Sequence, residues 1–101
     1  MTGTRAAIRY AKAILSVATD NQSSDKIQLE MNQIEHAIVS NPALNEALKS
    51  PVVKLSEKVG ILDKVFNGFS AEMKLLFQTL AQNKRIDLLE EISLQYKRLY
   101  D

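Results

Sequence analysis

Residues able to support catalysis are few in this chain and stand far apart in its sequence. The only histidine is His36, next to Glu35, and there is no cysteine, so a zinc site would depend on carboxylates for its other ligands. The three glycines are scattered and form no phosphate-binding loop. We therefore expect no catalytic residue, no metal site and no cofactor, and a protein that is not an enzyme.

Two clusters of charge near the end of the chain are explained by helix termini. Lys84 and Arg85 follow a predicted helix, whose negative end favours cations. Glu90 and Glu91 fall in the first turn of the next predicted helix, whose positive end favours anions. Neither cluster requires a substrate to account for it.

The overall charge balance argues against nucleic acid as a partner. Thirteen basic residues face twelve acidic ones, for a net charge of +1, and the two signs alternate along the 101 residues. A nucleic-acid-binding domain usually gathers its basic residues into a patch. No run of about 18 apolar residues occurs, so we expect no direct membrane insertion.

Functional information comes instead from a helix with more apolar surface than packing requires, predicted over residues 4–20. A core-facing stripe spans somewhat more than about 100° of a helix, whereas the apolar residues here fill an arc of roughly 220°. Such a helix is either surrounded by its neighbours or shared between its own core and a partner. Tyr10 favours the rim of a groove, because its ring prefers burial and its hydroxyl a polar contact. The arc comprises Ala6, Ala7, Ile8, Tyr10, Ala11, Ala13, Ile14, Leu15, Val17 and Ala18.

A second helix, predicted from Ser70 to about Asn83, shows a milder excess. Leu75 lies outside its core arc, on the side that carries Glu72 and Thr79. A lone exposed leucine is ordinary. Beside another over-apolar helix it would complete half of a hydrophobic groove, the usual receptor for an amphipathic helix.

These helices belong to a predicted all-α fold, a compact bundle of five or six helices. Breakers at Asn41-Pro42 and Ser50-Pro51 isolate a short third helix, and no alternating strand pattern occurs. The second helix, over about residues 24–40, is expected to bury Ile27, Met31, Ile34 and Ile38. The fourth covers about residues 55–67. The last, from about residue 87, is expected to bury Leu88, Leu89, Ile92, Tyr96 and Leu99.

Three segments resemble the delta subunit family of bacterial and chloroplast ATP synthases, a relative of the mitochondrial oligomycin-sensitivity-conferring protein. Residues 9–15 (RYAKAIL) are similar to the opening helix of the family, residues 48–53 (LKSPVV) to its Ser-Pro break, and residues 81–89 (AQNKRIDLL) to a later turn and helix. Lys84 stands where the family usually has glycine. We therefore expect Asn83 to adopt the left-handed conformation that ends the helix.

The resemblance implies a non-catalytic stator component of rotary ATP synthase, on the cytoplasmic face of the bacterial inner (plasma) membrane. It implies that residues 1–101 form the N-terminal helical domain and that the C-terminal domain, which contacts peripheral stalk subunits, is absent from this chain. The N-terminal helix of an alpha subunit would bind between the first and fifth helices. Tyr10, Ala13, Ile14 and Val17 would form one wall of that site, and Leu75, Leu76 and Thr79 the other.

Two other classes of function remain open on the sequence. A helical interaction module of an unrelated regulatory adaptor would share the fold and the lack of catalytic groups, so composition does not separate it from a stator component. A nucleic-acid-binding helical domain would differ in showing steep salt dependence of binding, because neutralised phosphates release counterions.

Overall fold

Helices account for most of residues 4–100, the part of the chain that the computed structural model describes. The six α-helices are α1 (Thr4–Asp20), α2 (Ser24–Ser40), α3 (Pro42–Lys49), α4 (Leu55–Val65), α5 (Ala71–Gln82) and α6 (Leu89–Tyr100). A short 3-10 helix, η1 (Ile86–Leu88), leads into α6. No strand occurs within this range. The predicted all-α bundle is therefore confirmed.

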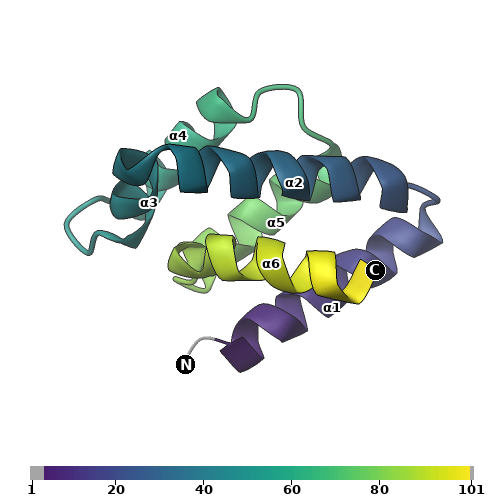
Figure 1. The fold of residues 1–101 in the computed structure, drawn as a ribbon. Helices are drawn as coiled ribbons and strands as arrows, with labels where there is room; N and C mark the ends of the chain where they lie inside the picture. Colours follow the sequence, from purple (N-terminus) through teal and green to yellow (C-terminus); the bar gives the residue numbers. More distant parts are fainter. Residues whose placement is uncertain (1–3, 101) are drawn as a thin grey trace.

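The C-terminal helix lies at the centre of the bundle. Figure 1 shows α6, in yellow, between α2 above it and α1 below it, and the contacts of α6 with these two helices are the most extensive in the fold. The helices α4 and α5 pack together, and α3 packs against α2 and η1. The Cα radius of gyration is 12.5 Å, close to the ~13 Å typical of a compact domain of about 100 residues.

Most of the predicted core positions are buried. The four predicted residues of α2 are all inside, namely Ile27, Met31, Ile34 and Ile38. In the last helical segment Leu88, Leu89, Ile92 and Tyr96 are buried as well. The prediction is wrong for Leu99, which is 37% exposed, because Tyr100 rather than Leu99 packs against the core in the final turn. The Tyr100 ring stacks on that of Tyr96 at a centroid distance of 6.1 Å.

A buried carboxylate from α2 holds the start of α5. Glu30 is only 6% exposed, and its Oε2 accepts a hydrogen bond from the backbone N–H of Ser70 at 2.8 Å. Its Oε1 accepts from the Ser70 hydroxyl at 2.7 Å. The Ser70 Oγ in turn accepts from the N–H of Met73 at 3.3 Å and so caps α5. One carboxylate therefore fixes both the position of α5 and its first turn.

Replacing this carboxylate by an amide should destabilise the fold. In Glu30→Gln only one side-chain oxygen remains to accept, and the amide NH2 faces donors from Ser70. We expect a loss of about 1–3 kcal/mol in the free energy of unfolding, measured by urea denaturation. The matched control is Glu35→Gln on the same helix, which should stay within about 0.5 kcal/mol of wild type. Equal stabilities for the two variants would contradict this role of Glu30.

The end of α5 corrects the prediction for Asn83. Asn83 has φ −90° and ψ 2°, whereas Lys84 has φ +58°. The N–H of Arg85 donates to the carbonyl of Leu80 at 2.7 Å, and that of Lys84 donates to Ala81 at 3.1 Å. These two bonds define a Schellman motif, whose left-handed residue is the second one after the helix. Lys84 occupies that position, so the register of the motif outweighs the greater tolerance of asparagine for this conformation.

Glycine at this position should therefore stabilise the protein. A side chain in the left-handed region costs roughly 1–2 kcal/mol, and the greater unfolded-state freedom of glycine offsets part of that gain. We expect Lys84→Gly to raise the free energy of unfolding by about 0.5–1 kcal/mol in a thermal melt. Gln78→Gly, at an exposed position inside α5, should shift it by a similar amount in the opposite direction. A loss of stability in Lys84→Gly would show that its side chain makes a compensating contact.

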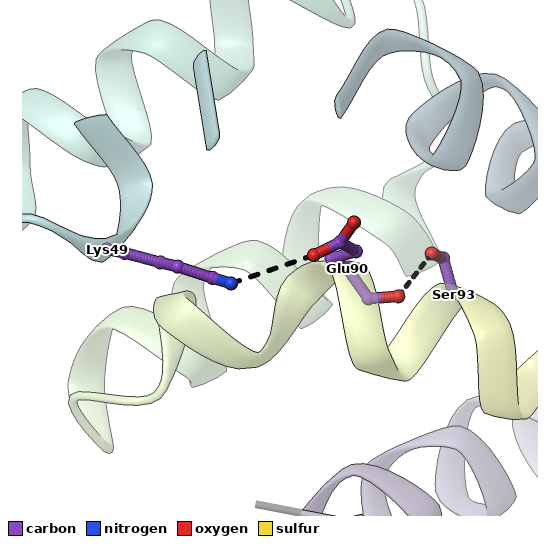
Figure 2. Close-up of polar contacts among 3 residues, drawn as sticks. All are labelled: Lys49, Glu90 and Ser93. Carbon is purple, nitrogen blue, oxygen red and sulfur yellow. Dashed lines mark hydrogen bonds and ion pairs between the residues drawn. The ribbon is translucent and has the colours of Figure 1, made fainter. Parts of the chain in front are cut away.

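One ion pair links the short helix to the central one. Lys49 Nζ lies 3.6 Å from Glu90 Oε1, and the Ser93 hydroxyl donates to the backbone carbonyl of Glu90 at 2.6 Å (Figure 2). The side chains of Lys49 and Glu90 are 50% and 30% exposed. A pair this accessible to water contributes little, at most about 1 kcal/mol.

Candidate functional site

The wide apolar arc of α1 is divided between the core and the molecular surface. On one side Ala7, Ala11 and Ala18 are fully buried, and Ile14 is nearly so. On the other side Ala13 is exposed and Val17 is 43% exposed. Neighbouring helices therefore do not surround α1, and one edge of its apolar arc is left uncovered in this chain.

The facing helix α5 is divided in the same way. Met73, Phe77 and Leu80 are buried in the core, whereas Leu75 is 63% exposed. Leu76 lies at the boundary, 7% exposed. The hydroxyl of Thr79 donates to the carbonyl of Leu75 at 2.8 Å, which satisfies it within the helix.

A groove of about 670 Å³ lies between these two uncovered edges. Its lining is mostly apolar and comes from residues 10–17 of α1, from the residue that follows α1, and from α5. The lining residues are Tyr10, Ala13, Ile14, Val17, Asn21, Ala71, Glu72, Leu75, Leu76 and Thr79. The structure thus brings together all seven residues predicted for the site. That they bind a partner stays a prediction.

At both ends of the groove, hydrogen bonds between polar side chains link the α1 side to the α5 side. At one end the Tyr10 hydroxyl accepts from Asn83 Nδ2 at 2.8 Å. At the other end Glu72 Oε2 accepts from the Ser23 hydroxyl at 2.9 Å and from Asn21 Nδ2 at 3.3 Å. The helices α1 and α5 consequently run antiparallel along the groove. Tyr10 and Asn21 are 11 residues apart, so the groove is about 16 Å long, or three helical turns.

The Glu72 end of the groove is negatively charged. The carboxyl of Glu72 accepts hydrogen bonds from its own backbone N–H, from Ser23 and from Asn21, and these bonds lower its pKa. The charge of Lys26 lowers this pKa further. Glu72 is therefore ionised at neutral pH. The Ser23 hydroxyl makes this bond instead of capping α2, although Ser23 is the N-cap residue of that helix.

A more polar cleft of about 460 Å³ continues the groove at its other end. It shares Tyr10 and Ala13 with the groove. The other lining residues are Ala6, Arg9, Asn83 and Arg85. Both arginines are exposed, and neither makes an ion pair with another residue in the described part of the chain. The two ends of the combined surface therefore differ in the sign of their charge.

Sequence analysis identified the walls of the groove but missed its ends. Asn21 lies just past the predicted end of the first helix, at residue 20, although it follows Val17 at the spacing of one helical turn. Ala71 precedes Leu75 by the same spacing. Extending each wall by one turn would have found both residues. The link from Tyr10 to Asn83 joins residues 73 apart, and no local pattern could have indicated it.

Away from the groove, residues 4–100 present no group of three or more His, Cys, Asp or Glu side chains arranged to hold a metal ion. His36 is exposed on α2 and does not line the groove. None of the helices described here combines the length and the hydropathy needed to cross a membrane.

A family model and several curated proteins that are similar to this chain carry the same subunit name. Residues 6–101 match the family model described as ATP synthase delta (OSCP) subunit. The chain is 38% identical over 101 residues to the ATP synthase subunit delta of Flavobacterium psychrophilum and 37% identical over 101 residues to that of Flavobacterium johnsoniae. It is 40% identical over 96 residues to that of Christiangramia forsetii. These matches cover 95–100% of this chain but 52–57% of the relatives, so the chain spans about half the length of the curated relatives it matches.

Proposed function

This chain belongs to the ATP synthase delta (OSCP) subunit family, and on that premise we propose that it is a non-catalytic stator component of rotary ATP synthase. Residues 1–101 would act as the N-terminal domain. This domain would bind the N-terminal helix of an alpha subunit, while a separate C-terminal domain would meet the peripheral stalk. The complex would place the protein peripherally on the cytoplasmic face of the bacterial inner membrane.

The observation that carries this proposal is the groove between α1 and α5. Its apolar lining and its length of about three helical turns suit an amphipathic helix with apolar residues at positions i, i+3, i+4 and i+7. Ala13, Ile14 and Val17 would contact that helix from one wall, and Leu75, Leu76 and Thr79 from the other. Tyr10 would close the groove at its α1 rim.

A stator component holds the catalytic head against the torque of rotation, so it needs a stiff scaffold and slow release of its partner. The α1 wall packs on α6, the central helix, and Glu30 fixes the start of the α5 wall. Both walls are therefore supported from behind. Variation in affinity between related interfaces lies mostly in the dissociation rate, and burial of an apolar helix face lowers that rate. Neither requirement calls for a cofactor or for catalysis.

The experiment that tests this function is a titration with a synthetic peptide. The peptide covers the N-terminal helix of the alpha subunit encoded by the same genome. Calorimetry should show saturable 1:1 binding with a salt dependence much weaker than that of a nucleic-acid complex, and NMR shift changes should concentrate on α1 and α5. Absence of binding, or shift changes confined to another face, would overturn the proposal. Binding to duplex DNA with a steep salt slope would favour the nucleic-acid alternative instead.

A further inference from the structure

The charges at the two ends of the groove have opposite signs, although the lining between them is apolar. Glu72 stands at the end where α5 begins. Arg9 and Arg85 line the cleft at the other end, beyond the hydrogen bond between Tyr10 and Asn83. This polarity belongs to the binding surface itself, because all three side chains line one of the two contiguous cavities.

From this arrangement we infer that the helix bound in the groove carries charges of opposite sign at its two ends. An acidic side chain of the helix contacts Arg9 and Arg85, and a cationic group of the helix lies beside Glu72. This inference rests on the proposed function, since it specifies the chemistry of the partner helix.

The end of the surface lined by Arg9 and Arg85 has the greater need of a counter-charge from the partner. Arg9 lies on α1 and Arg85 follows α5, so each of the two chain segments that border the cleft contributes one arginine to its lining. No acidic residue lines this cleft. Guanidinium groups bind carboxylates in a bidentate geometry, with charge-assisted hydrogen bonds stronger than those between neutral groups. A carboxylate from the partner would therefore supply the counter-charge that the lining lacks.

The Glu72 carboxylate at the opposite end has less need of a counter-charge from the partner. The side-chain hydrogen bonds from Ser23 and Asn21 both fall on Oε2, so Oε1 accepts neither of them. Lys26 on α2 already offsets part of the carboxylate charge. A cationic group of the partner beside Glu72 would thus contribute less to the affinity than a carboxylate of the partner beside Arg9 and Arg85.

The two charged ends give the partner a direction. An apolar groove accepts the apolar face of a helix in either orientation, because contact between aliphatic surfaces has no polarity. Charges at the rim act mainly on the choice of partner, on register and on the association rate. The reversed orientation would place like charges together at both ends and would be disfavoured.

The test compares two double variants with the same change in formal charge, using the alpha-subunit peptide as probe. Arg9→Glu with Arg85→Glu should weaken binding at least about tenfold at low salt, and the loss should shrink near 0.5 M salt because exposed charges are screened. Lys12→Glu with Lys74→Glu changes exposed lysines of α1 and α5 that line neither cavity, and should stay within about twofold of wild type. Circular dichroism checks the fold, and Arg9→Gln with Arg85→Gln replaces the reversal variant if that one unfolds.

A second probe tests the inference from the side of the partner. A peptide in which every Asp and Glu is replaced by Asn and Gln should bind the wild-type protein about tenfold more weakly, and the arginine variants should weaken it little further. If both arginine variants bind the original peptide like the lysine control, the inference is wrong while the groove proposal stands. If the wild-type protein binds no alpha peptide at all, both are wrong.

Discussion

Ala13→Glu is expected to remove most of the affinity for the alpha-subunit helix while leaving the fold intact. Ala13 lines both the groove and the adjoining cleft and is exposed in this chain. A glutamate there would place a carboxylate against the apolar face of the partner. Burial of an unpaired charge at the centre of an interface can cost about 2–4 kcal/mol, or roughly 30- to 1,000-fold in affinity.

The stability of the variant separates a binding effect from a folding effect. Because Ala13 is at the surface, the free energy of unfolding should stay within about 1 kcal/mol of wild type. The measurement pairs a thermal melt with a peptide titration of the same preparation. Ser16→Glu, on the exposed polar face of α1, adds the same charge outside the groove and should bind like wild type.

Two outcomes would contradict this prediction. A folded Ala13→Glu protein that binds as tightly as wild type would remove Ala13 from the interface. A glutamate at this position can also pair with Arg9 one turn away, so the uncharged variant Ala13→Gln is measured as well. Glutamine has nearly the size of glutamate without its charge, and Ala13→Gln should lose less affinity than Ala13→Glu. Equal losses of affinity in the two variants would assign the effect to steric exclusion and not to the charge.

The sequence predicted the walls of the groove better than it predicted their pairing. Helical periodicity alone places Ala13 and Val17 on one edge of α1 and Leu75 outside the core arc of α5. Periodicity does not say which helices are neighbours in space, because that depends on how all six pack. The pairing of α1 with α5 came from the resemblance to the delta subunit family, and the bonds from Tyr10 to Asn83 and from Glu72 to Ser23 agree with it.

The sequence predicted the conformation and burial of single residues at helix ends less well. Asn83 was predicted as the left-handed residue because it tolerates that conformation, yet the hydrogen-bond register of the motif assigns the conformation to Lys84. Leu99 was predicted as buried because it continues an apolar stripe, yet Tyr100 covers the core at the end of α6. In both cases the deciding contact involves only one or two residues, and a periodic pattern averages over such contacts.

A glutamate two positions before Ala13 is expected to have the opposite effect. Ala11 is fully buried, on the face of α1 that packs into the core, and α1 makes its most extensive contacts with α6. In Ala11→Glu the added carboxylate would lack a hydrogen-bond partner and would also exceed the space left by a methyl group. We expect a loss of at least about 4 kcal/mol in the free energy of unfolding.

A loss of that size is a large part of the stability of an ordinary domain, which is about 5–15 kcal/mol. Urea denaturation of Ala11→Glu should show a greatly lowered midpoint or no cooperative transition. The milder Ala11→Ser adds one hydroxyl, which can bond back to a carbonyl of its own helix, and should lose only about 1 kcal/mol. The pair of glutamate variants defines the rotation of α1, because positions 11 and 13 differ by about 200° around the helix. If Ala13→Glu unfolded the protein and Ala11→Glu did not, the face of α1 assigned here to the groove would instead be its core face.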